Sequence, residues 1–254
     1  MSLVDQYCPD AHTAALTAAY FDADSAACIT ADAWGVVAIT KPHDRTPSHI
    51  FQTWDAVYGA VTLSPGGSLA GVGDETGSVA VYKTWDGTCV FEEVRNDDEG
   101  RARAMRALAF NPQGTLLASL AADGIIRVYD IARWERTANW SGYSGRSLCF
   151  DPAGNQLLVI DNLNQPKLID MLSQEQIDIE MVPGGVVVAR FTPGGSHIVA
   201  MGPGGITLIG MPDRRIVTSF TARGASEMLS MVISPAGTEV AAITQRSVLS
   251  LIHI

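Results

Sequence analysis

Histidine is the residue type in this sequence best suited to acid–base chemistry near neutral pH, and the chain contains five. His12 is the most informative of them, because it lies nine residues before Phe21 and leads into a run of β-prone residues. An imidazole held by a carboxylate can act as a general base. No nucleophile is spaced to join His12, and no serine lies in a strained, glycine-flanked elbow. We therefore expect a structural role for His12 and ordinary loop or strand positions for His43, His49, His197 and His253.

Carboxylates are plentiful, with 27 Asp and Glu residues, but most of them lie in expected turns. Asp is favoured in turns because its side chain accepts hydrogen bonds from neighbouring backbone amides. We therefore expect these residues to stabilise turns locally rather than to bind ligands. The turn aspartates are Asp22, Asp32, Asp74, Asp123, Asp151 and Asp161.

Metal and cofactor signatures are lacking in the sequence. The glycine-rich residues 202–205 lack the Lys-Ser/Thr of a phosphate-binding loop and a following helix. The four cysteines are far apart and form no C-x-x-C pair or short-range His spacing of the zinc-binding kind. We expect no metal and no cofactor, and reduced thiols at Cys8, Cys28, Cys89 and Cys149.

Charge also limits the partners. The chain has 17 Lys and Arg residues against 27 Asp and Glu, so its net charge of −10 should repel a phosphate backbone or an anionic membrane. No basic leader precedes an apolar run at the start, and no apolar stretch approaches the roughly eighteen residues of a membrane span. These observations predict a cytoplasmic protein that binds neither nucleic acid nor membrane.

An internal repeat organises the whole chain. Its pattern is an apolar residue, a polar residue, often a proline, and then a small residue or glycine at a turn. The successive intervals are 42, 47, 40, 41 and 42 residues, which is the period of a β-propeller blade. The apolar leads of the six copies are Phe21, Leu63, Phe110, Phe150, Phe191 and Ile233.

A complete copy contains four short β-prone runs. In the third copy these are residues 107–110, 116–120, 125–130 and 136–140. The Pro-X-Gly segment between the first two runs is typical of a hairpin, because Pro presets φ and Gly accepts φ above zero. No segment shows a long helical period, so the sequence predicts four-stranded antiparallel sheets.

The third copy resembles the repeats of the WD-repeat β-propeller family. Residues 109–114 (Ala-Phe-Asn-Pro-Gln-Gly), the Asp123-Gly124 turn and residues 128–130 (Val-Tyr-Asp) are similar to that family's repeat, with Tyr129 in the tryptophan position. Trp85-Asp86 follows a strand that already ends at Tyr82, so we interpret it as a turn. The other copies are degenerate at the Trp-Asp position, which holds Tyr82-Lys83, Ile169-Asp170, Ile209-Gly210 and Ile252-His253.

The resemblance implies an all-β fold: a six-bladed β-propeller of four-stranded antiparallel blades, formed by residues 1–254 as a single domain. Seven blades, the commoner number in the family, is the alternative. The last copy supplies only two strands after its turn, at 239–243 and 248–254, and residues 3–7 are β-compatible and unassigned. In the family an N-terminal strand completes the last blade, so residues 3–7 are expected to pair with 248–254.

The resemblance also implies a role for the first histidine. In the family, a histidine ahead of the innermost strand usually hydrogen-bonds an aspartate in the second turn and so ties the loop to the sheet. His12 and Asp32 occupy these two positions.

An enzyme remains the alternative function, because six-bladed propellers include metal-dependent lactonases that gather Glu, Asn and Asp at the central channel. The expected innermost strands contain no carboxylate, which argues against this. Arg190 breaks their apolar composition; we expect an inter-blade hydrogen bond or a side chain reaching solvent, with an anion site in the channel as the alternative. These strands are residues 14–20, 57–63, 106–110, 147–150, 186–191 and 228–233.

The favoured function is a non-catalytic, monomeric platform that binds another protein or peptide. Its recognition surface is expected on the top face, where each blade's second turn and the connections between blades lie. The long connection at residues 95–103, dense in both signs of charge, is either part of that surface or a solvated loop. Aromatic and arginine residues dominate interface energetics, so the candidate partner-binding residues are Trp34, Trp54, Tyr58, Glu75, Arg103, Tyr143, Arg146 and Arg246.

Overall fold

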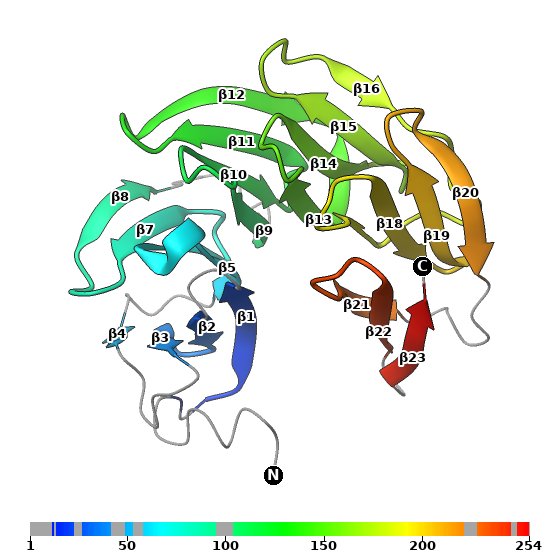
Figure 1. Ribbon diagram of the computed structural model, residues 1–254. Coiled ribbons are helices and arrows are strands. Elements are labelled where there is room, and N and C mark those ends of the chain that lie inside the picture. Colours follow the sequence, from blue (N-terminus) through cyan, green and yellow to red (C-terminus); the bar gives the residue numbers. More distant parts are fainter. Residues whose placement is uncertain are drawn as a thin grey trace. The chain divides into compact units, whose positions relative to one another are not determined.

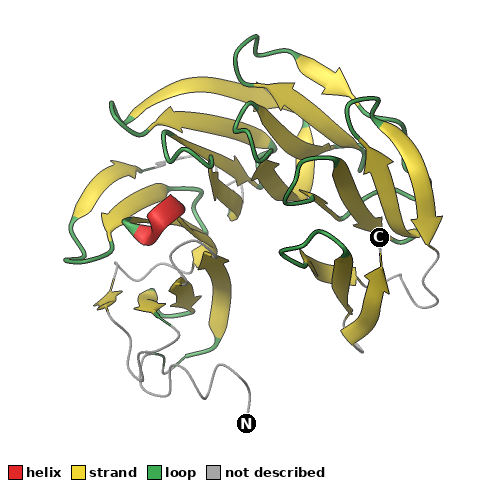
Figure 2. Cartoon of the chain, viewed as in Figure 1, coloured by secondary structure: helices red, strands yellow, loops and turns green. Residues whose placement is uncertain are grey.

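The computed structural model describes residues 12, 14–22, 27–41, 49–52, 58–94, 104–220, 228–244 and 248–253. Apart from one short 3-10 turn, η1 (Pro65–Gly67), the regular structure of these residues is β-strand, as Figures 1 and 2 show. The strands form antiparallel sheets in which sequence neighbours pair. The expected all-β class with four-stranded antiparallel sheets is therefore confirmed.

The chain divides into two compact units, Met1–Trp140 and Ser141–Ile254. The described part of unit 1 holds three four-stranded sheets. Their strands are β1 (Leu16–Asp22), β2 (Ala27–Asp32), β3 (Val36–Thr40), β4 (His49–Gln52), β5 (Tyr58–Leu63), β6 (Leu69–Asp74), β7 (Val79–Lys83), β8 (Cys89–Glu93), β9 (Met105–Phe110), β10 (Leu116–Ala121), β11 (Ile125–Asp130) and β12 (Glu135–Ser141).

Unit 2 has two further four-stranded sheets and one sheet, β21-β22-β23, with three described strands. The expected pairing of residues 3–7 with this last sheet lies outside the described residues, so closure of a ring stays a prediction. The strands are β13 (Tyr143–Phe150), β14 (Gln156–Asp161), β15 (Pro166–Asp170), β16 (Gln176–Asp178), β17 (Val188–Phe191), β18 (His197–Gly202), β19 (Gly205–Gly210), β20 (Arg215–Phe220), β21 (Met228–Ile233), β22 (Glu239–Thr244) and β23 (Val248–His253).

In five of the six repeats the apolar lead ends the first strand of its sheet, and in all six it lies opposite the start of the second strand. Leu63 pairs with Ala70 and Phe110 with Leu117. Because both members of such a pair are buried, the lead must be apolar. Phe21 differs most, because its side chain is exposed although it pairs with Cys28 in the same register, and Ile233 is half-buried.

The polar residue after the lead has the same task in five of the six repeats. Its side-chain oxygen accepts a hydrogen bond from the backbone N–H five residues on, which closes the turn. The five described pairs are Ser64 with Leu69 at 2.9 Å, Asn111 with Leu116 at 2.8 Å, Asp151 with Gln156 at 2.7 Å, Thr192 with His197 at 3.1 Å and Ser234 with Glu239 at 3.0 Å.

Trp85-Asp86 lies in the turn between β7 and β8, as expected. There the Asp86 carboxylate accepts a hydrogen bond of 2.9 Å from the Thr88 N–H. The Trp85 ring is exposed, and the Lys83 ammonium lies 5.5 Å from its centre. The pair is therefore a local turn element rather than the end of a strand.

Aliphatic side chains fill the space between successive sheets inside each unit. In unit 1, Ile29 and Val37 of the first sheet join one buried cluster with Val61 and Val72 of the second. In unit 2, Leu158 and Leu168 join another with Ile198 and Ile209. Full burial of one such side chain contributes roughly 1.5–3 kcal/mol, so these layers supply most of the cohesion between sheets.

Gly59 lies where β5 and β6 lose regular register, between the pairs Tyr58–Asp74 and Ala60–Gly73. Such irregularities bend a strand and bring backbones close together. A Cβ added at Gly59 would overlap the backbone carbonyl oxygen of Met105 in the next sheet. Close packing of these two sheets therefore requires glycine here.

We expect Gly59→Ala to lower the free energy of unfolding by roughly 1–3 kcal/mol, the usual cost of overpacking. Gly194→Ala is the control, because a Cβ at Gly194 meets no atom within 4 Å and its φ is not positive. Its effect should stay within about 0.5 kcal/mol. Urea unfolding of both variants measures the difference, and equal stabilities would contradict the steric explanation.

Candidate functional site

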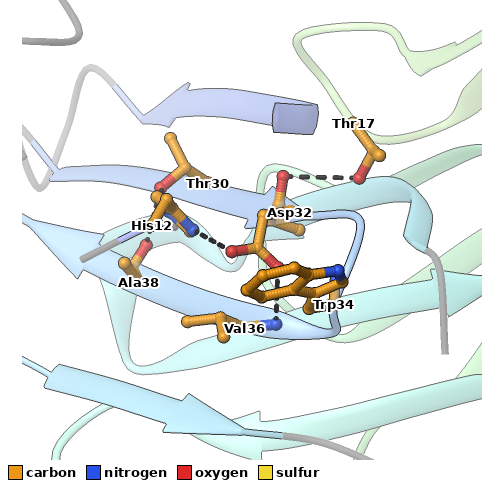
Figure 3. A network of polar contacts seen from close by, with 8 residues as sticks. His12, Thr17, Thr30, Asp32, Trp34, Val36 and Ala38 are labelled. Atoms are coloured by element: carbon orange, nitrogen blue, oxygen red, sulfur yellow. Dashed lines mark hydrogen bonds and ion pairs between the residues drawn. The ribbon is translucent and has the colours of Figure 1, made fainter. Parts of the chain in front are cut away.

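The site begins with two polar side chains of the first sheet and a histidine that precedes it, drawn in Figure 3. Thr30 and Asp32 are two residues apart on β2 and so point to the same side of the strand. His12, which precedes β1, reaches both: Nδ1 lies 3.0 Å from Asp32 Oδ2, and Nε2 lies 2.7 Å from Thr30 Oγ1. The contact between His12 and Asp32 that the family resemblance implied is present.

Asp32 also organises the turn that follows it. Its Oδ1 accepts hydrogen bonds from the backbone N–H groups of Trp34 at 2.9 Å and Val36 at 3.0 Å. The carboxylate is fully buried. It therefore connects the segment before β1 to the turn between β2 and β3.

Electrostatics favour the charged form of Asp32. Burial acts to raise its pKa, but hydrogen bonds from the Val36 N–H, His12 and the Trp34 N–H outweigh burial and lower the pKa below its ordinary value of 3.8. A lowered folded-state pKa means that this carboxylate contributes stability above pH 3.8. The contribution is lost as the pH falls through the lowered value.

The order hydroxyl, imidazole, carboxylate is that of a serine-hydrolase triad. The sequence analysis found no nucleophile spaced to join His12, and the structure brings the Thr30 hydroxyl to its imidazole. Sequence spacing could have indicated it, since Thr30 precedes Asp32 by two strand positions. The hydroxyl is nevertheless inaccessible: Thr30 is 6% exposed, and its Oγ1 also donates to the Ala38 carbonyl at 3.5 Å. A substrate cannot reach it, which favours a structural network.

Other second turns repeat the carboxylate contact without the histidine. Asp74 Oδ1 accepts from the Thr76 and Ser78 N–H groups at 2.9 and 2.8 Å. Asp161 Oδ1 accepts from the Leu163 and Gln165 N–H groups at 2.8 and 2.9 Å. These aspartates are local turn supports, as expected.

The third sheet stabilises its second turn differently. Ala121 stands at the position of the capping aspartate, and Asp123 accepts hydrogen bonds from the Ile125 N–H at 2.9 Å and from Arg127 Nη2 at 3.0 Å. The sequence analysis missed this buried ion pair. The sequence did contain a signal for this pair, because Arg127 lies on a predicted strand four residues after the turn residue Asp123.

The proposed partner-binding residues fall into three groups. Trp34, 60% exposed, and Glu75, also exposed, lie in second turns as expected. Tyr58 lies on β5 and Arg146 on β13, and their side chains are outside the described part of the structure, as are Trp54, Arg103 and Arg246 altogether.

Tyr143 does not fit the proposed surface and is a correction to it. The residue starts β13 opposite Asp161 and is only 3% exposed. Burial and then the nearby Asp161 carboxylate raise the pKa of its phenol to about 12. Its ring packs in the interior and is not available to a partner.

Arg190 is exposed on β17, so its charge is not buried. The link between the first strands of two sheets in unit 2 comes instead from the Ser147 hydroxyl, which donates to the Ala189 carbonyl at 2.8 Å. The described residues contain no group of three or more His, Cys, Asp or Glu side chains able to hold a metal ion. They also include no helix long and apolar enough to cross a membrane.

Comparison with known proteins relates part of this chain to WD-repeat proteins. Residues 61–144, which span the second and third sheets, match the family model of the WD40 domain of anaphase-promoting complex subunit 4. A curated relative is WD repeat-containing protein 91 of Danio rerio, 38% identical over 61 residues. That alignment covers 24% of this chain and 8% of the relative. Both matches support the WD-repeat family, so the expected resemblance is confirmed.

We expect His12→Ala to lower the free energy of unfolding by roughly 1–3 kcal/mol, because Asp32 and Thr30 lose a buried partner. Thr30→Val, which keeps the shape of the side chain, should cost about 1 kcal/mol through the lost contact with Nε2. Chemical denaturation measures both.

The control is Thr17→Val, because Thr17 is exposed and makes only a 3.3 Å hydrogen bond to the Ala31 carbonyl. It should change stability by less than about 0.5 kcal/mol. A His12→Ala protein of unchanged stability that has lost a hydrolytic activity would overturn the structural interpretation.

Proposed function

We propose that this chain is a non-catalytic interaction module that binds another protein or a peptide through the turns at one end of its sheets. The observation that carries the proposal is the presentation of Trp34. Its ring is exposed, yet its backbone N–H is held by the buried Asp32 carboxylate. A large aromatic side chain on a fixed turn binds at low entropic cost.

Strand direction selects the end. Antiparallel order places the second turn of a sheet at the end opposite to its first and third turns. Trp34 and Glu75 lie in second turns, whereas Trp85 lies in a third turn. The proposed binding surface comprises Trp34 and Glu75, with Tyr58, Arg146, Trp54, Arg103 and Arg246 as its further members.

The matches to WD40 proteins support an interaction role. The predicted innermost strands carry no carboxylate that could build a catalytic channel. A cytoplasmic monomer remains part of the proposal. So does a single closed ring of six blades, in which residues 3–7 complete the sheet of β21, β22 and β23.

Deletion of residues 1–8 tests the closure. If the segment supplies a strand, the deletion exposes the edge of β23 and should lower the melting temperature by at least several degrees, since about 1 kcal/mol shifts it by 2–4 °C at this size. Deletion of residues 1 and 2 alone is the control and should have little effect. Unchanged melting after the longer deletion would refute the closure.

A pair of tryptophan variants tests the binding end. A partner isolated by pull-down with the whole chain should bind Trp34→Ala at least tenfold more weakly, as expected for an interface hot spot. Trp85→Ala removes a similarly exposed ring from the opposite end of a sheet and should leave affinity unchanged. The reverse pattern would assign binding to the opposite end.

A further inference from the structure

Three loops of unit 2 lie at the end of their sheets where the second turns are found, and two of the three are themselves second turns. They are residues 162–165 between β14 and β15, residues 179–187 between β16 and β17, and residues 203–204 between β18 and β19. We call these residues the loop platform.

Hydrogen bonds hold the platform together. The Val186 N–H donates to the Asn164 carbonyl at 2.7 Å. The Gln165 side chain contacts Val182 twice, accepting from its N–H at 2.8 Å and donating to its carbonyl at 3.3 Å. The long connection is thereby fixed to the neighbouring turn, so its shape is set before any partner arrives.

Glycines allow the loop backbones to approach closely. A Cβ added at Gly184 would lie 3.2 Å from the Gly204 nitrogen, and one at Gly204 would lie 2.7 Å from the Pro183 carbonyl oxygen. Contacts this short exclude side chains between the two loops. In the platform, the two loops therefore pack directly backbone against backbone.

Two apolar side chains project from the platform. The connection buries Ile179, Val182 and Val186, but Met181 is 72% exposed. Leu163 is 73% exposed and stands two residues after a capping aspartate, the position that Trp34 has in the first sheet. A rigid turn thus presents a large apolar side chain in each unit.

The platform is also nearly free of charge. Glu180 is the one charged residue within these ranges, and its carboxylate already accepts a hydrogen bond of 2.7 Å from the Ile216 N–H. The two aspartates that flank the ranges, Asp161 and Asp178, both pair with Lys167. On a chain of net charge −10, a neutral apolar surface on fixed backbone suits a neutral apolar ligand. An anionic ligand would require basic residues, and a basic segment would require free carboxylates.

We propose that the loop platform docks an uncharged, apolar segment of a partner polypeptide, with Leu163 and Met181 as the contacting side chains. The proposal rests on the proposed interaction function and specifies its partner chemistry. Methionine suits this role, because its flexible thioether adapts to apolar surfaces of different shape.

The test uses the full chain and a phage-displayed library of short random peptides. Panning should enrich peptides with adjacent apolar residues and no acidic ones. The best peptide is then synthesised with a fluorophore and titrated by fluorescence polarisation. Leu163→Ser and Met181→Ser should each weaken its binding about tenfold, the range for contacts at an interface centre.

Leu172→Ser is the matched control. Leu172 is 96% exposed but lies in the turn between β15 and β16, at the other end of the same sheet. Its replacement should leave peptide affinity unchanged. All three positions are exposed, so each variant should fold, and an unfolding curve for each variant checks this.

The remaining outcomes separate the two proposals. If Trp34→Ala abolishes peptide binding while Leu163→Ser and Met181→Ser bind the peptide normally, the platform proposal is overturned and the proposed function stands. Peptides lost only on Leu172→Ser or Trp85→Ala would overturn both. Enrichment of charged peptides alone, or of none, would overturn the platform proposal.

Discussion

The structure depends on side-chain oxygens that receive backbone N–H groups inside the first turns of five sheets and several of the second turns. Tight turns leave amide donors that the sheet ladder does not reach, and a buried donor without an acceptor is costly. Ser64, Asn111 and Asp151 provide the acceptor at first turns, and Asp32 and Asp161 provide it at second turns. Strand register and sheet packing follow, because the closed turn determines which residues of adjacent strands face each other.

These side-chain acceptors allow buried and exposed residues of one turn to have different roles. Asp32 is buried and fixes the backbone of the turn, while Trp34, two residues later, is free to face solvent. His12 and Thr30 complete the buried side of the arrangement. The hydroxyl, imidazole and carboxylate have the contacts of a catalytic triad, but they are buried and therefore act as a structural network. Position in the fold, rather than the identity of the groups, decides their chemistry.

Local features were predictable from the sequence, and features that depend on packing were not. Repeat spacing located the turns, and the Asp preference for turns anticipated the local role of Asp74 and Asp161. Spacing could not reveal that Tyr143 is buried, because burial depends on segments far away in the chain. Thr30 was missed although it precedes Asp32 by two strand positions, because the sequence does not show that His12 contacts a residue 18 positions away. Exposure of Leu163 and Met181 likewise emerges only when the loops are assembled.

The first-turn support has a consequence for how such repeats change over time. Ser, Asn, Asp and Thr all make the same bond to the N–H five residues on. Any short side chain with an oxygen therefore satisfies the geometry, and a copy can exchange one for another without rebuilding its hairpin. Because the requirement is only a short side chain with an oxygen, the amino-acid sequences of the copies can diverge faster than their structures. The structures of two copies would then still show their common origin after their amino-acid sequences no longer do.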